Sequence, residues 1–280
     1  MSSEHNLWVA FGLTAIAGLA TGIGSLIALT FKRTNTKFLC ASLGFSAGVM
    51  LYVSFMELIP EARKDFLLHF GDKTGTLYLL FAFFGGMGLI TLIDFLIPES
   101  NNPHEFQRVE EMNQPDNRQG FHLNQPGNRQ KSLHRTGIVV AFSLAIHNFP
   151  EGIATFTSAL SGLSLAIPIT IAVAIHNIPE GIAVSVPIYH ATGNKRKAFW
   201  LSFLSGLAEP LGALIAFLVL MPFWSPLMNS IVLAAVAGIM VYISLDELLP
   251  TAEKYGEHHI SISGLIAGMI MMAMSLFFFI

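Results

Sequence analysis

Long apolar runs separated by short polar stretches dominate the chain. A hydrocarbon core about 30 Å thick needs about 20 apolar residues in one helix. By that rule the sequence contains eight stretches that can each cross a membrane: residues 7–30, 38–60, 76–97, 136–159, 163–189, 198–221, 228–250 and 260–280. The pattern therefore predicts an all-α polytopic membrane protein with eight transmembrane helices in contact with the lipid bilayer.

The longest polar stretch, residues 98–135, lies between the third and fourth spans. It contains two similar segments, Asn113–Gln119 and Asn124–Gln130. Such a polar, proline-bearing stretch cannot bury a core, so we expect a flexible cytoplasmic loop. The chain then divides into residues 1–97 with spans one to three, the loop 98–135, residues 136–189 with spans four and five, and residues 190–280 with spans six to eight.

Composition supports the membrane interpretation. The chain is 53% hydrophobic and 12% charged, whereas soluble domains carry about 25% charged residues. The net charge of −3 gives no indication of nucleic-acid binding, and the single cysteine, Cys40, excludes an internal disulfide. The N-terminus lacks the basic region of a cleaved signal, so we expect the first apolar run to be retained.

The distribution of basic residues predicts the orientation. If the N-terminus is outside the cytoplasm, the inner loops hold twelve Lys and Arg residues, and the outer loops hold three, which are Arg63, Lys64 and Lys73. Because basic residues concentrate on the cytoplasmic side, we expect both termini to lie outside the cytoplasm.

A polar octapeptide occurs twice inside these apolar runs. Residues 147–154 read His-Asn-Phe-Pro-Glu-Gly-Ile-Ala, and residues 176–183 read His-Asn-Ile-Pro-Glu-Gly-Ile-Ala. Polar and ionisable groups are costly in a transmembrane helix and normally face a cavity with a function. In a helix the His, Asn and Glu of each copy share one face, and the proline predicts a kink that frees backbone carbonyls. A kinked helix with a satisfied polar patch is the alternative for one copy, and the duplication argues against it.

These side chains indicate metal binding. Two imidazoles and two carboxylates, from His147, His176, Glu151 and Glu180, make a plausible four-ligand site for Zn²⁺. The oxygens of Asn148, Asn177 and Glu209, with the two glutamates bridging, offer a second position. Since no thiolate is present, the set suits Zn²⁺, Fe²⁺, Co²⁺ and Mn²⁺ and gives no special case for Cu⁺, while the paired histidines argue against Mg²⁺.

A second repeat relates the second and seventh spans. Residues 47–60 align with residues 237–250 at a constant offset of 190, sharing Ala, Gly, Met, Tyr, Ser, Glu, Leu and Pro. The two spans are an odd number of helices apart, so their copies should run in opposite directions. This pattern predicts inverted-repeat pseudosymmetry around a binding site at the midplane, as in secondary transporters. Convergent packing motifs are the alternative.

At these residues the chain resembles the ZIP family of divalent metal transporters, especially its bacterial ZupT-like branch. The resemblance rests on the eight spans, the long third loop, both His-Asn-x-Pro-Glu-Gly motifs and the segments Ser205–Glu209, Ser244–Pro250 and Ala47–Met50. It implies import toward the cytoplasm, a binuclear metal site at mid-membrane, a homodimer and a bacterial inner (plasma) membrane location. It also implies that spans one, four, five and six slide against the other four.

The resemblance also implies a role for each matching residue. It places His147, Glu151, His176 and Glu180 in a first metal site, and Asn148, Asn177 and Glu209 in a second that shares both glutamates. Met50, Ile169 and Val173 resemble a hydrophobic gate on the external side, Glu57 resembles an entrance ligand, and Asp94, Asp246 and Glu247 fall where exit ligands belong. The loop 98–135 holds only His104, His122 and His134, so we do not expect it to sense metal.

The resulting hypothesis is a Zn²⁺ importer, with iron, cobalt, manganese and cadmium as further substrates, that works by alternating access. The metal is cargo rather than a cofactor, and no enzymatic activity is expected. A metal-selective channel is the nearest alternative. An intramembrane metallohydrolase with Glu151 or Glu180 as general base is another, but the sequence has no His-Glu-x-x-His motif.

Overall fold

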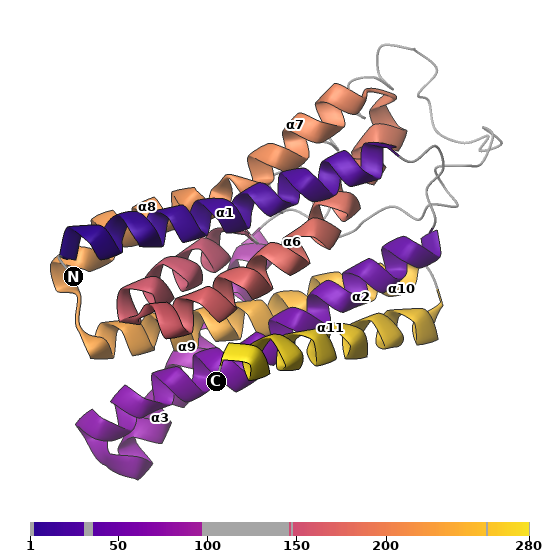
Figure 1. Cartoon of the computed structure of the whole chain (residues 1–280). Coiled ribbons are helices and arrows are strands. Elements are labelled where there is room, and N and C mark those ends of the chain that lie inside the picture. The colour runs from indigo at the N-terminus through magenta and orange to yellow at the C-terminus, as the bar shows by residue number, and fades with distance from the viewer. Residues whose placement is uncertain (1–2, 31–35, 97–145, 147, 256, 280) are drawn as a thin grey trace.

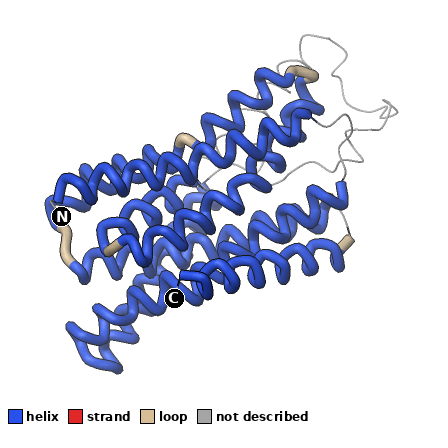
Figure 2. Tube along the Cα trace, viewed as in Figure 1, coloured by secondary structure: helices blue, strands red, loops and turns tan. Residues whose placement is uncertain are grey.

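The computed structural model describes residues 3–30, 36–96, 146, 148–255 and 257–279. Within these ranges the chain is helical almost throughout and contains no strand, as Figure 2 shows. The predicted all-α class is therefore confirmed for the described residues. The loop 98–135 lies outside them.

The helices follow the predicted spans closely. The elements are α1 (Ser3–Thr30), α2 (Thr36–Val53), η1 (Ser54–Leu58), α3 (Ile59–Leu96), helical residues 148–161, α6 (Leu163–Thr192), α7 (Lys195–Gly206), α8 (Ala208–Leu220), η3 (Met221–Phe223), α9 (Pro226–Ile243), η4 (Ser244–Leu248), α10 (Leu249–Tyr255) and α11 (His258–Phe279). Six helical stretches among the described residues are long and apolar enough to cross a membrane. One of them, Thr36–Leu96, covers both the second and the third predicted spans, and residues 136–145 of the fourth are not described. The count of eight stays a prediction.

The connection between the second and third spans differs from an irregular loop. Helical structure continues from η1 through α3, and the break falls at Gly71, whose φ of 73° and ψ of 173° are not helical. Before the break, Ala62 and Phe66 are buried, while Arg63 and Lys64 are exposed. Since positions four residues apart share a helix face, this segment is an amphipathic extension that packs at the end of the bundle. A search for apolar runs of spanning length does not register it.

The helices form two groups. In one, α1 packs against α6, α7 and α8, and in the other α2 packs against α10 and α11 while α3 packs against α9. Figure 1 shows that α6, a member of the first group, lies next to the second group. Its contact with α2 is the largest that joins the two groups. The contacts of α1 with α6, α7 and α8 agree with the grouping of spans one, five and six that the family resemblance implies, while the place of the fourth span in that grouping stays a prediction.

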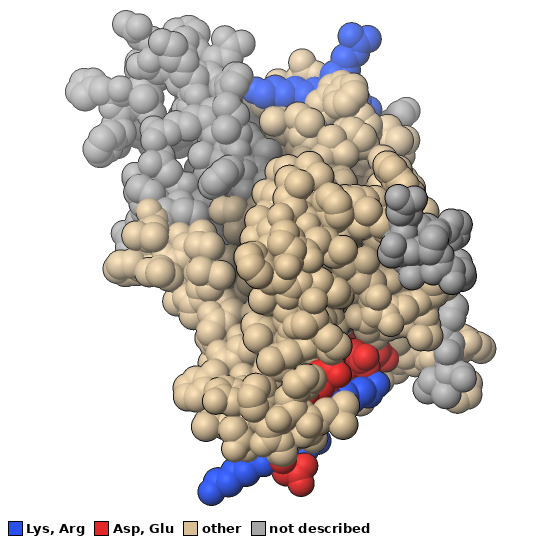
Figure 3. Space-filling model, turned by 90° about the vertical axis from the view of Figure 1, so that its left-hand side faces the viewer, with Lys and Arg blue, Asp and Glu red and all other residues tan. Residues whose placement is uncertain are grey.

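The outer surface is that of a protein in a bilayer. Large apolar side chains such as Trp8, Leu68, Phe95 and Phe278 are exposed. On the face in Figure 3, charged residues gather toward the two ends, and a broad uncharged band separates them. Such a band matches the hydrocarbon core, in which charged side chains are costly.

Both copies of the 47–60 repeat contain a π-helical turn at the same place. In η1 the Ile59 amide donates to the Ser54 carbonyl, and in η4 the Leu249 amide donates to the Ser244 carbonyl. The Ser54 hydroxyl also donates to the Met50 carbonyl at 2.8 Å. The wider turns immediately precede prolines, whose rings would press on the carbonyl four residues earlier in a regular helix. They contain the acidic residues of the repeat, in keeping with the frequent occurrence of π-turns at functional sites.

Glycines set the close approach of neighbouring helices. A Cβ atom added at Gly48 of α2 would overlap the Leu265 carbonyl of α11, and one added at Gly268 of α11 would overlap the Phe45 carbonyl of α2. Small residues at such crossings let membrane helices pack backbone against backbone.

We expect Gly48→Ala to lower the thermal stability of the detergent-solubilised protein. The added methyl group cannot fit against the α11 backbone, and such overpacking costs about 1–3 kcal/mol. Gly88→Ala is the matched control, since a Cβ there meets nothing within 4 Å and alanine favours a helix by about 1 kcal/mol. Thermal unfolding followed by circular dichroism gives both midpoints, and equal midpoints would contradict the packing argument.

Candidate metal centre

The two copies of the octapeptide meet because the chain folds back at Gly162. This residue, with a φ of 148°, joins the helical residues 148–161 to α6. Glu151 before the turn contacts His176 after it. The helix assignment continues through Pro150 and Pro179 in both arms.

Glu151, His176 and Glu180 form a buried trio. One ligand atom from each residue lies within 4.8 Å of the others, and each side chain is at most 1% exposed. Nε2 of His176 lies 2.8 Å from Oε1 of Glu151. A hydrogen bond at this distance needs a proton between the two atoms, and a metal ion bound to both would replace that proton.

The backbone fixes the orientation of the His176 ring. Its Nδ1 lies 3.0 Å from the Ala172 carbonyl. Because a carbonyl only accepts, Nδ1 donates the proton, and Nε2 faces the two glutamates. Metal-binding histidines are commonly oriented by such a second hydrogen bond. His147, the fourth predicted ligand of this site, lies outside the described residues.

The three residues of the second predicted set lie beside the trio. The Asn177 amide donates to Oε1 of Glu209, and also to the Ala17 carbonyl at 2.9 Å. The Asn148 side chain lies within hydrogen-bonding reach of both Glu180 and Glu209. Oδ1 of Asn177 and Oε2 of Glu209 are buried and find no hydrogen-bond partner within the part of the chain that the structure describes. Buried polar atoms are normally satisfied, and a cation with oxygen ligands would satisfy both of these.

The charge of the site demands a cation. Glu180 is close enough to Glu151, Glu209 and Glu247 to interact with the charge of each, and all four side chains are at most 4% exposed. Among the described residues, no lysine or arginine is buried to balance them. Carboxylates this close repel one another strongly in a low-dielectric interior. Protons or divalent cations are the remaining sources of compensation.

The motif glycines bring neighbouring helices to the site. A Cβ at Gly152 would overlap the Glu209 carbonyl of α8, and one at Gly181 would overlap the Thr21 carbonyl of α1. Sequence analysis did not assign α1 a part in the site, although its Ala17 carbonyl holds Asn177. The one available signal was the run of small residues around Thr21 in an otherwise bulky apolar span.

The three residues of the predicted gate are buried together in the apolar core. Met50, Ile169 and Val173 are at most 1% exposed and belong to one apolar cluster. Ile169 and Val173 precede His176 on its own helix face, at seven and three residues.

The acidic pathway residues differ in exposure. Glu247 is buried, Asp94 and Glu57 are half-buried, and Asp246 is exposed. Tyr242 lies within hydrogen-bonding reach of Asp246, and the charge of Asp94 also acts on it. The structure thus brings Asp94 and Asp246 near each other, whereas Glu57 lies in the separate turn η1.

Comparisons with known proteins agree with the chemistry of the site. The sequence profile of the family described as ZIP Zinc transporter matches residues 5–276. A protein named Zinc transporter ZupT from Clostridium perfringens is 58% identical over 278 residues, covering 99% of this chain and 98% of its own length. Proteins of the same name from Streptococcus mutans and Nitratidesulfovibrio vulgaris are 55% and 50% identical, and each is covered over 100% of its length.

We expect His176→Gln and Glu151→Gln to weaken Zn²⁺ binding to the detergent-solubilised protein by about tenfold or more. Loss of an outer-shell partner alone costs about 10–100-fold in metal affinity, and loss of a direct ligand should cost no less. Isothermal titration calorimetry gives the affinities. Glu257→Gln is the control, because Glu257 is exposed and pairs with Lys37. Wild-type Zn²⁺ affinity in both variants would show that the trio is not part of the Zn²⁺-binding site.

Proposed function

Because the chain belongs to the ZIP family of zinc transporters, we propose that it imports Zn²⁺ across a bacterial inner membrane into the cytoplasm. Iron, cobalt, manganese and cadmium are expected competing substrates. The buried trio of Glu151, His176 and Glu180 carries this proposal. It offers nitrogen and oxygen ligands for a divalent ion within apolar helices. The function is transport rather than catalysis, and the ion is cargo.

The centre is proposed to hold two ions. His147 completes the first position with the trio, while Asn148, Asn177 and Glu209 make the second. The buried oxygens of Asn177 and Glu209 support this second position. Shared glutamates suit transport, because each ion is held strongly enough to lose water and weakly enough to leave.

Transport is proposed to occur by alternating access. The apolar cluster around Met50 closes one side of the centre, which the positive-inside rule makes the external side. Glu57 and Glu247 occupy the same position in the two copies of the second repeat, each inside a π-turn. An inverted repeat would place Glu57 at the external entrance and Glu247 at the cytoplasmic exit.

The two helix groups are proposed to slide past each other. Their interface includes the apolar contact of α2 with α6. One polar contact also crosses it: the Asn229 amide of α9 donates to the Ser161 hydroxyl at 2.9 Å, beside the Gly162 turn. On the proposed topology this bond lies at the external end, where it stabilises the externally closed state.

Two further statements belong to the proposal. Both termini face away from the cytoplasm, and the protein forms a homodimer, as the family resemblance implies. A metal-selective channel is the remaining transport alternative. Saturation of uptake at low Zn²⁺ with slow turnover distinguishes a carrier from it.

We expect Glu151→Ala and Glu180→Ala to abolish Zn²⁺ uptake into proteoliposomes, because each removes a ligand of the trio. A zinc-sensitive dye inside the vesicles measures the initial rate. Glu257→Ala should retain wild-type uptake. Full activity in both site variants would exclude the trio from the transport pathway.

We expect Ser161→Ala to open the external side more often. A net hydrogen bond contributes about 1 kcal/mol, which corresponds to about a fivefold shift in the equilibrium between closed and open states. The rate at which a membrane-impermeant thiol reagent labels Val173→Cys, in a Cys40→Ser background, reports this opening and should rise several-fold. Ser263→Ala is the control, since that exposed hydroxyl donates to the His259 carbonyl of its own helix. An unchanged labelling rate would show that the bond does not hold the closed state.

A further inference from the structure

A strip of side chains along α7 and α8 changes from basic to aromatic to aliphatic. It begins at Arg196 in the first turn of α7 and continues, at steps of three or four residues, with Trp200, Leu204, Leu207 and Leu211. Such steps place side chains on one face of a helix. We call this face the α7 strip. A phospholipid has the same order of chemistry, from a charged headgroup through an interfacial region to an apolar chain.

The α7 strip faces outward from the bundle. Trp200 is 55% exposed, Leu204 is 54% exposed and Leu211 is 50% exposed, while α7 packs against α1 and α6. The Trp200 ring makes edge contacts with the rings of Phe199 and Phe203, at centroid distances of 5.4 and 5.7 Å. Because tryptophan prefers the boundary between headgroups and hydrocarbon, this ring marks that boundary about one turn from Arg196.

The end of the molecule at which α7 begins is basic without acidic neighbours. Lys195, Arg196 and Lys197 are consecutive, and the sequence contains no Asp or Glu from residue 181 to residue 208. The acidic residue of α1, Glu4, lies at the opposite end of that helix. On the face in Figure 3, the upper end shows Lys and Arg atoms alone, whereas the lower end shows them together with Asp and Glu atoms. This end therefore attracts anions.

Lys195 differs from the two basic residues that follow it. Its Nζ donates to the Leu29 carbonyl in the last turn of α1 at 2.6 Å and lies 5.7 Å from the centre of the Tyr189 ring of α6. Lys195 thus connects the ends of three helices. Within the part of the chain that the structure describes, neither Arg196 nor Lys197 has an ion pair or a side-chain hydrogen bond. Their charges are available to an anion outside the protein.

We propose that the α7 strip binds an anionic phospholipid of the leaflet at this end, which is the cytoplasmic leaflet in the proposed topology. Arg196 and Lys197 pair with the phosphate, Trp200 lies at the level of the glycerol region, and an acyl chain follows the leucines. A guanidinium suits this role because it can donate two hydrogen bonds to one phosphate. A soluble phosphate would leave the exposed leucines without a partner, so the ligand is a lipid.

Quenching of Trp200 fluorescence by brominated lipids measures this binding. Trp200 is the single tryptophan in a background that carries Trp8→Phe and Trp224→Phe. The protein is reconstituted into phosphatidylcholine vesicles that contain an increasing share of brominated phosphatidylglycerol or brominated phosphatidylcholine. We expect a preference for phosphatidylglycerol of at least about fivefold, since each Lys or Arg near an anionic surface contributes about 1 kcal/mol.

Two variants separate the basic residues from general exposure to lipid. Arg196→Gln with Lys197→Gln should bring the preference close to one, while both lipids still quench Trp200 because the leucines remain. Lys37→Gln is the matched control. Lys37 lies at the same end of the bundle but pairs with Glu257 at 3.1 Å, so the preference should stay at its original value.

Three outcomes would overturn the proposal. They are equal quenching by the two lipids before the basic residues are changed, an unchanged preference in the double variant, and loss of the preference on addition of inorganic phosphate at matched ionic strength. The last would show that the basic residues bind a soluble anion instead. The measurement uses no zinc, so its result does not depend on the proposed transport function.

Discussion

The burial of several carboxylates inside an apolar bundle is the constraint on which the rest of the structure depends. Moving one ionised carboxylate from water into a protein interior costs several kcal/mol even after relaxation, and Glu151, Glu180, Glu209 and Glu247 are buried near one another. Amides and an imidazole take up part of that cost, since Asn177 bonds Glu209 and His176 bonds Glu151. The fold is therefore completed by whichever cation balances the remaining charge, which ties stability to the cargo.

This constraint also explains the close helix packing. An amide can bond a carboxylate only when the helix that carries it lies near, and Asn177 must reach α1 and α8 together. Gly152 and Gly181 directly follow the two motif glutamates. Gly152 lets the helical residues 148–161 approach the backbone of α8, and Gly181 lets α6 approach the backbone of α1. In the structure each one faces a neighbouring helix, so their effect on the ligands is indirect.

The part of the candidate site that stands out in the sequence consists of residues that are costly to bury. His176, Glu151 and Glu180 stand out in an apolar run because nothing but function explains their presence there. The contribution of α1 leaves no such mark, because Asn177 bonds the backbone carbonyl of Ala17 and every residue has a carbonyl. The two π-turns were equally hidden, since hydropathy reports burial and not helical pitch. The helical extension before Gly71 was missed for a different reason. A search for apolar runs long enough to span a membrane does not detect a short amphipathic helix.

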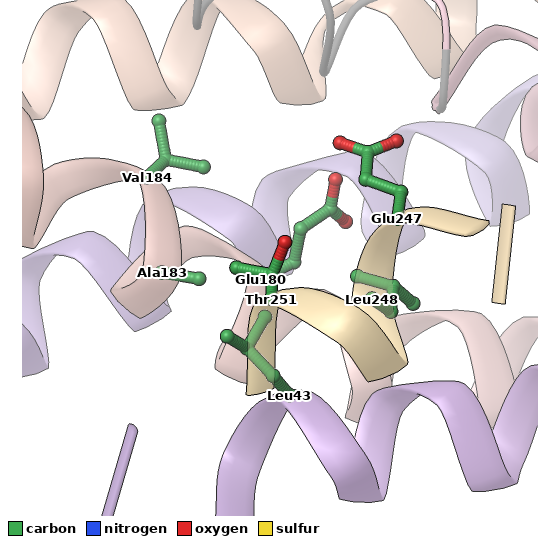
Figure 4. Close-up of a pocket in the computed structure, with 7 residues that line it drawn as sticks. All are labelled: Leu43, Glu180, Ala183, Val184, Glu247, Leu248 and Thr251. Carbon is green, nitrogen blue, oxygen red and sulfur yellow. The ribbon is translucent and has the colours of Figure 1, made fainter. Parts of the chain in front are cut away.

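The residues that precede the trio along α6 differ in chemistry from those that surround Glu180. The proposed transport path takes its direction from that difference. Met50, Ile169 and Val173 are buried members of one apolar cluster, and an apolar surrounding is unfavourable for a hydrated ion. Glu180, in contrast, lies close enough to the buried Glu247 to interact with its charge (Figure 4). In the proposed mechanism, opening the external side requires the apolar cluster to separate. The two helix groups meet at this cluster through α2 and α6. In that mechanism the gate is part of the interface that slides, so opening the external side and moving the binding site are one event.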